Sequence, residues 1–168
     1  MKIVLTAVSA FIGTNLDDIF ILMLLFSQCK DKKQQQCVAA GQHMGIITLT
    51  FISILSAAGI KLLILKYIGL LGVIPVILGV KQWFEYRNAN EDSINFNIAD
   101  SSNIILNTAF ITLSNGADNL GVYIPLFSGF GSVELLYTVI IFLIMTSFWC
   151  FLGKKISDLP VIDNFLSE

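Results

Sequence analysis

The sequence has few charged residues and lacks the motifs of nucleotide hydrolysis. Only 13% of its 168 residues are charged, whereas soluble domains carry about 25%. The chain has ten lysines and arginines and twelve aspartates and glutamates, so its net charge is -2 and it offers no basic surface to nucleic acid. It also contains no glycine-rich phosphate loop of the Walker type. These absences exclude a nucleic-acid-binding protein and a nucleotide-driven pump.

Ligands for soft metals are scarce as well. There are three cysteines, Cys29, Cys37 and Cys150, none of them in a CxxC pair, and the only histidine is His43. The cysteines form no disulfide framework, which favours free thiols facing a reducing cytosol. A cysteine-rich metal cluster is therefore not predicted.

Apolar residues dominate what is present. Hydrophobic residues make up 55% of the chain, and the mean hydropathy is +0.79. Five apolar segments each approach the roughly 20 residues that a helix needs to cross a bilayer. They cover residues 4–27, 38–59, 64–84, 103–127 and 133–153. The predicted fold class is an all-α integral membrane protein with five transmembrane helices.

The placement of basic residues predicts the orientation, because cytoplasmic loops are enriched in lysine and arginine. With the N-terminus outside, seven basic residues face the cytoplasm and three face out. The seven are Lys30, Lys32, Lys33, Lys81, Arg87, Lys154 and Lys155. We therefore expect the N-terminus outside.

Polar side chains interrupt two of the apolar segments near their centres. The first segment contains TNLDDIF, residues 14–20, and the fourth contains SNGADN, residues 114–119. Both carry a hydroxyl-Asn-x-x-Asp pattern, offset by 100 residues: Thr14, Asn15 and Asp18 in the first, Ser114, Asn115 and Asp118 in the second. Further along the chain Leu25-Phe26 matches Leu126-Phe127 with an offset of 101. With that offset, Asp17 and not Asp18 is the counterpart of Asp118 in the repeat. The pattern predicts an internal repeat.

The polar stretch 85–102 divides the chain into two parts. We interpret residues 1–84 as a first three-helix repeat, 85–102 as a cytoplasmic linker, and 103–168 as an incomplete second repeat of two helices and a polar tail. Because each full repeat holds an odd number of helices, the second must be inverted relative to the first. This 3+3 arrangement, with its sixth helix absent, would bring both polar motifs together near the middle of the membrane, as in many secondary transporters.

The two motifs have the chemistry of a cation site. On an ideal helix, residues three or four apart share a face, so each motif offers a carboxylate, an amide oxygen and a hydroxyl. A carboxylate at the helix centre costs roughly 2.5 to 3.5 kcal/mol, which favours a functional role over simple helix–helix hydrogen bonding. The predicted metal ligands are Asp17, Asp18, Asp118, Asn15, Asn115 and Asn119, with Thr14 and Ser114 as accessory groups.

The backbone near these motifs raises a geometric problem. Asp17 and Asp18 are about 100° apart on an ideal helix, so they reach one cavity only at its two edges, or one of them binds a neighbouring helix. Gly13 and Gly116 leave room for a close approach of another backbone or for a local helix break.

Four strings resemble the CadD-type cadmium-resistance transporter family, a branch of the lysine-exporter superfamily. They are GTNLDDIFILMLLF at 13–26, GQHMG at 41–45, YIGLLGVIPVILG at 67–79 and NGADNLGVYIPLF at 115–127. The resemblance runs along nearly the whole chain. It implies efflux of cadmium, and of other divalent metals, by a multi-pass protein of the bacterial plasma membrane. Family members have six helices, which implies that the last helix has been lost by truncation or is supplied by a partner.

The identification of cadmium as the transported metal rests on the resemblance alone, because oxygen ligands by themselves favour hard ions such as magnesium, calcium or manganese. Cys29 and Cys37 flank a lysine-rich loop whose charges would lower a thiol pKa and assist capture of a soft ion; inert thiols are the alternative. His43 is a further accessory candidate, with an interfacial hydrogen-bonding role as its alternative.

The expected mechanism is metal-for-proton exchange, since clustered carboxylates in a low-dielectric cavity do not all ionise together. The metal is then a substrate, no cofactor is expected, and the partners are the bilayer, protons and another copy of the chain. An exporter of an amino acid or organic cation is the alternative within transport, and a noncatalytic membrane assembly subunit is the alternative of another class. Enzymatic activity is not expected, because the YD and GxGD motifs of intramembrane aspartyl proteases are absent.

Overall fold

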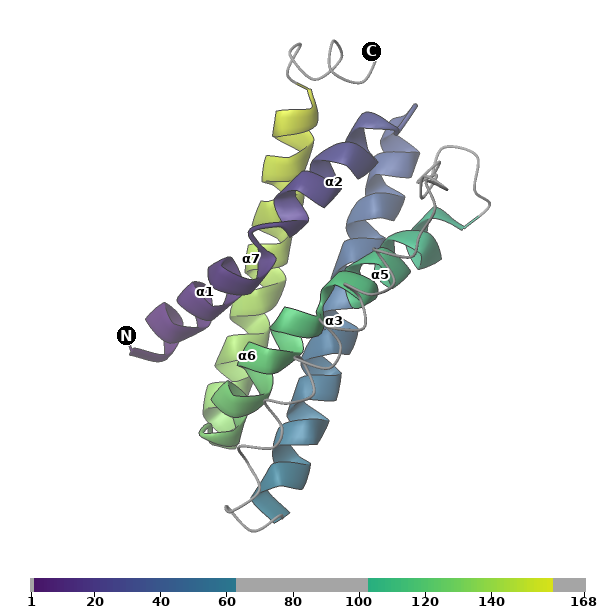
Figure 1. Cartoon of the computed structure of the whole chain (residues 1–168). Helices are drawn as coiled ribbons and strands as arrows, with labels where there is room; N and C mark the ends of the chain where they lie inside the picture. Colours follow the sequence, from purple (N-terminus) through teal and green to yellow (C-terminus); the bar gives the residue numbers. More distant parts are fainter. Residues whose placement is uncertain (1, 63–102, 159–168) are drawn as a thin grey trace, which may run out of the picture.

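The computed structural model describes residues 2–62 and 103–158, which form helices joined by short connections (Figure 1). The helices are α1 (Lys2–Asn15), α2 (Asp18–Ser27), α3 (Lys32–Leu62), α5 (Ile104–Asn115), α6 (Ala117–Ser128) and α7 (Ser132–Ser157). There is no strand in these two ranges, which confirms the all-α fold class. The predicted segment at 64–84 and the linker at 85–102 lie outside the described residues.

Two of the predicted spans are continuous helices and two are broken. α3 and α7 are each long and apolar enough to cross a membrane. α1 and α2 are long and apolar enough only together, and they bend by 61° where they meet. α5 and α6 are likewise separated at a single residue, Gly116. The segments expected at 4–27 and 103–127 are therefore each interrupted near the middle.

Each break has a local cause. The indole N–H of Trp149 on α7 donates to the backbone oxygen of Asn15, so this carbonyl at the end of α1 has a partner outside its own helix. At the second break Gly116 has low helix propensity, and a side chain there would clash with Leu49 of α3. Gly116 thus shows both the close approach and the local break that the sequence left open as alternatives. Gly13 has open space around it and lies before the first break.

The long helices pack across the two halves of the chain. α3 lies along α5 and α6, whereas α7 lies along α1 and α2. In addition α1 contacts α6, and α2 contacts α5, so the two broken helices run antiparallel (Figure 1). This packing places the two breaks side by side.

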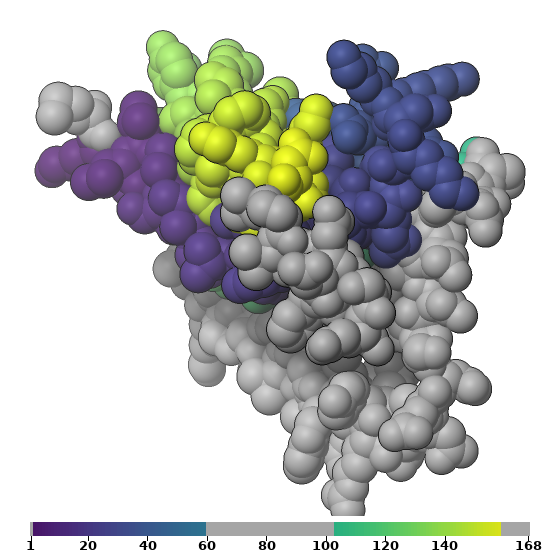
Figure 2. Space-filling view, turned by 90° about the horizontal axis from the view of Figure 1, so that it is seen from above, coloured from purple at the N-terminus to yellow at the C-terminus, as the bar shows by residue number. Residues whose placement is uncertain are grey.

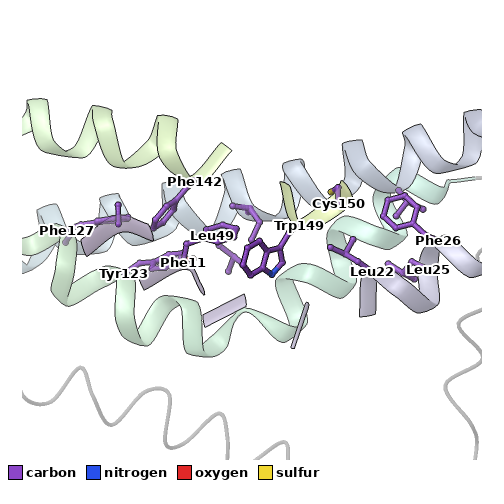
Figure 3. Packing of buried hydrophobic residues seen from close by; sticks show 14 residues of the cluster. Phe11, Leu22, Leu25, Phe26, Leu49, Tyr123, Phe127, Phe142, Trp149 and Cys150 are labelled. Atoms are coloured by element: carbon purple, nitrogen blue, oxygen red, sulfur yellow. The ribbon is translucent and has the colours of Figure 1, made fainter. Parts of the chain in front are cut away.

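An aromatic cluster fills the space beside the breaks (Figure 3). Phe142 of α7 lies 5.4 Å from Phe11 of α1 and 4.6 Å from Tyr123 of α6, measured between ring centroids. The outer faces are apolar instead of charged: Phe20 is 66% exposed and Phe110 is 72% exposed. Large exposed apolar side chains on both broken helices fit surfaces that face lipid.

Two glycines let α3 approach α5 closely. A Cβ atom added at Gly41 would lie 2.6 Å from the Cβ of Thr108, and one added at Gly45 would lie 2.6 Å from the Cβ of Thr112. Small residues at helix contacts are a common way to pack helices tightly in membranes. The spacing of the GQHMG string thus sets the distance between α3 and α5.

We expect Gly45→Ala to destabilise the protein, because the new methyl group would overlap Thr112; overpacking of this kind costs about 1 to 3 kcal/mol. The matched control is Gly59→Ala in the same helix, where a Cβ meets nothing within 4 Å and alanine favours the helix by up to about 1 kcal/mol. Thermal unfolding in detergent should show a lower midpoint for Gly45→Ala and an unchanged or higher one for Gly59→Ala. Equal midpoints would contradict the tight contact.

Candidate metal-binding site

The helix breaks bring one amide group between two carboxylates. The side-chain nitrogen of Asn115, at the end of α5, donates to Asp17 Oδ2 at 2.8 Å and to Asp18 Oδ1 at 3.2 Å. Both aspartates lie at the start of α2, across the antiparallel contact. On an ideal helix Asp17 and Asp18 would point about 100° apart. Because the helix is kinked here, both carboxylates accept from the same Asn115 amide group. A donor between two carboxylates lies where a cation would be most strongly attracted.

A second chain of hydrogen bonds fixes Asp18 from the other side. Asp18 Oδ2 accepts from Gln42 Nε2 of α3 at 2.9 Å. The hydroxyl of Thr112 on α5 donates in turn to Gln42 Oε1 at 2.6 Å. These three side chains are buried. We call Asp17, Asp18, Gln42, Thr112 and Asn115 the carboxylate cluster.

Sequence analysis missed Gln42 and Thr112 as members of this site. The available signal was the GQHMG string, in which a glutamine stands between glycines in an apolar segment. Gly41 and Gly45 bring α3 against α5, and this approach lets Gln42 reach both Thr112 and Asp18. The contact partner could not be read from the string, because it lies 70 residues away along the chain.

The remaining asparagines belong to a separate network on the other side of the breaks. The phenol oxygen of Tyr123 accepts from Thr14 Oγ1 at 3.0 Å and from Asn15 Nδ2 at 2.9 Å. Asn119 Nδ2 donates to Asn15 Oδ1 at 3.4 Å. We call Thr14, Asn15, Asn119 and Tyr123 the amide–phenol cluster. The expectation that Asn15 and Asp18 share one helix face fails, because the helix is broken between them.

The third predicted aspartate lies at the edge of the carboxylate cluster. Asp118 is in the first turn of α6, exposed, and near enough to Asp17 and Asp18 to repel them electrostatically. Ser114 is also exposed. Within residues 2–62 and 103–158, no three acidic, histidine or cysteine side chains converge closely enough to hold a metal ion. Any metal bound here would need amide oxygens as well as carboxylates.

His43 is engaged with groups other than the carboxylate cluster. Its Nδ1 donates to the backbone oxygen of Ala39 at 2.8 Å, and its Nε2 is 3.0 Å from the hydroxyl of Ser147 on α7. Gln42 and His43 are neighbours in α3, but Gln42 contacts α5 while His43 contacts α7. This geometry matches the alternative of an interfacial hydrogen-bonding role.

The Cys29 thiol matches the alternative of an inert thiol. Burial raises the pKa of Cys29 to about 11, and Asp31 and Cys37 add to the shift. Its sulfur also donates to the backbone oxygen of Leu25 at 3.3 Å. The lowered thiol pKa considered for the lysine-rich loop is therefore not found at Cys29, where desolvation is the largest influence. No hydrogen bond links Cys29 or Cys37 to the carboxylate cluster in the described parts of the chain.

Long apolar helices, apolar outer surfaces and a polar cluster at two antiparallel helix breaks are features of a multi-pass membrane protein. A scan against family models matches residues 11–168 to the cadmium resistance transporter family. The chain belongs to this family, which is associated with metal transport and cadmium resistance. Searches of curated proteins and of solved structures returned no significant match.

The high pKa of Cys29 makes its reactivity strongly dependent on pH. In a Cys37→Ser, Cys150→Ser variant, we expect the alkylation rate of Cys29 by iodoacetamide to rise about tenfold per pH unit from pH 8 to 10, because only the thiolate reacts. The rate is measured by mass spectrometry of the alkylated peptide. A plateau below pH 9 would mean that the lysines control this thiol after all.

Proposed function

We propose that the protein exports divalent metal ions, cadmium foremost, from the bacterial cytoplasm across the plasma membrane in exchange for protons. Its family supports a metal ion as the substrate. The observation that carries the proposal is the Asn115 amide nitrogen between Asp17 and Asp18. Asp18 is buried and Asp17 is exposed. Two neighbouring carboxylates favour a positive partner, and the amide N–H group lies at the position where a cation would bind.

A bound ion would need an oxygen atom of Asn115 at the position that its side-chain N–H group now occupies. Rotation of the Asn115 side chain exchanges its N–H group for its carbonyl oxygen, so that three oxygen ligands surround the ion. Asp118, exposed at the edge of the cluster, supplies a further carboxylate on the path of the ion. Oxygen ligands alone would favour a harder metal. Cadmium as the foremost substrate therefore rests on the family.

The amide–phenol cluster offers an additional acceptor. The side-chain oxygen of Asn119 is buried and has no hydrogen-bond partner among the described groups. A buried acceptor without a partner costs about 1 to 3 kcal/mol. A passing cation would relieve this cost, and we propose Asn15 and Asn119 as secondary ligands on the far side of the breaks.

The packing supports an inverted repeat as the basis of transport. Each broken helix lies on the long helix of the other half, and the two broken helices are antiparallel. In inverted-repeat transporters, discontinuous helices form the central site and one repeat moves against the other. Lys32 and Lys154 line one groove at a single end of the bundle, which supports that end as cytoplasmic and the N-terminus as outside.

Proton coupling follows from the same carboxylates. Neighbouring carboxylates in a low-dielectric environment do not all ionise together, so in this scheme the three aspartates share protons before a metal ion binds. Binding of a divalent ion displaces these protons, and their return from outside releases the ion. A metal gradient and a proton gradient are thereby linked without nucleotide hydrolysis.

Inside-out membrane vesicles with an acidic lumen should accumulate cadmium while their lumen becomes less acidic. We expect Asp17→Asn, Asp18→Asn and Asp118→Asn each to lower the initial rate by about tenfold or more, because losing even an indirect metal contact typically costs 10- to 100-fold in affinity. Radioactive cadmium and a lumenal pH dye report the two fluxes together.

The matched control is Asp158→Asn, an exposed carboxylate that follows α7. This variant should keep the wild-type rate at equal membrane abundance. Cadmium uptake without any change in lumenal pH would refute proton exchange, and equal rates in all four variants would refute the site.

Gln42 is a positioning residue in this scheme, because it orients Asp18 without being a proposed ligand. We expect Gln42→Ala to raise the cadmium concentration for half-maximal transport by about 10-fold or more. Thr112→Val removes the hydroxyl that fixes Gln42 and should act in the same direction with a smaller effect. The control is Thr48→Val, whose hydroxyl donates to Met44 within α3. If Gln42→Ala behaves like Thr48→Val, Gln42 has no positioning role.

A further inference from the structure

A groove lies at one end of the bundle, between the start of α3 and the end of α7. Figure 2 shows both helix ends on the face seen from above. The groove has a volume of about 260 Å³, whereas a water molecule occupies about 30 Å³ in the liquid. It is therefore large enough for a chemical group of several atoms.

The groove is lined by basic, amide and apolar side chains. Lys32 of α3 and Lys154 of α7 contribute two amines from different helices, and Gln35 and Gln36 contribute amide groups. Phe151, which is 60% exposed, forms part of the apolar wall. Basic and apolar groups in one groove match a ligand with an anionic head and an apolar tail.

No acidic group in the described parts of the chain pairs with these amines. None of the residues that line the groove is acidic. Asp31, which immediately precedes α3, accepts from the backbone N–H of Gln34 at 2.7 Å. Neither Lys32 nor Lys154 forms an ion pair with a carboxylate from the described stretches 2–62 and 103–158. The two charges are thus available to an anion.

We propose that this groove binds an anionic phospholipid, with Lys32 and Lys154 contacting the headgroup phosphate and an acyl chain lying along Phe151. Lysines that merely anchor a helix end in the interface need no cavity between helices. Here two helices share the cavity, and basic pockets between membrane helices are suited to anionic headgroups. The inference stands independently of metal transport.

The test uses the full-length chain in detergent, with phosphatidylglycerol as the probe and phosphatidylethanolamine of the same acyl chains for comparison. Native mass spectrometry gives the apparent dissociation constant for each lipid. We expect Lys32→Gln combined with Lys154→Gln to weaken phosphatidylglycerol binding by about tenfold or more, since each basic residue near the surface contributes about a fivefold change. Phosphatidylethanolamine should bind weakly to every variant.

The matched control is Lys33→Gln combined with Lys155→Gln, which removes the same charge from adjacent exposed positions outside the groove. It should change the dissociation constant by less than about threefold. Ala39→Phe keeps every charge but fills the groove, so it should also weaken binding. Inorganic phosphate at millimolar concentration should not compete, because it lacks the acyl chain.

Three results would overturn the proposal. Equal losses in the two double variants would mean a diffuse electrostatic attraction to the whole basic end. Unchanged binding in Ala39→Phe would mean that the groove is not the binding place. Competition by inorganic phosphate would identify a small-anion site instead of a lipid site. The lysine substitutions are at exposed or half-buried positions, so they leave the packed core unchanged.

Discussion

The candidate site depends on one contact, the Asn115 amide held between Asp17 and Asp18. It joins the end of α5 to the start of α2, next to both helix breaks. The antiparallel pairing of the broken helices then leaves α3 and α7 to cover them from opposite halves of the chain. Changing this contact would therefore alter both the site and the packing around it.

The energetics explain why the polar cluster is built with so many amides. A carboxylate near the middle of a membrane costs roughly 2.5 to 3.5 kcal/mol, whereas a hydrogen bond to a charged group contributes about 1.5 to 3 kcal/mol. Asp18 accepts from both Gln42 and Asn115, so these two bonds are of the same size as the cost of placing it there. Amide groups stabilise the carboxylates without cancelling their charge, which keeps the cluster attractive to a cation.

The sequence predicted the parts of this arrangement that follow from hydropathy and repetition. It identified the helical membrane fold, the family and the polar motifs on the first and fourth segments. It failed where the backbone departs from an ideal helix. The 61° bend between α1 and α2 separates Asn15 from Asp18 and unites Asp17 with Asp18, the reverse of what helical periodicity predicts.

Tertiary contacts explain the other differences. Gln42 joins the site only because Gly41 and Gly45 bring α3 against α5, a distance that no local pattern encodes. The Cys29 thiol lies next to lysines in the sequence, but its pKa is set by burial. Neighbours along the chain were a poor guide wherever packing determined the environment.

The most direct test of the account is X-ray absorption spectroscopy of cadmium bound to the purified protein, because it identifies the ligand atoms. The account predicts a first coordination shell of oxygen atoms that changes in Asp18→Asn and persists when all three cysteines are replaced by serine. A sulfur-containing shell that disappears with the cysteines would contradict a site at the helix breaks and would assign the metal to the thiols.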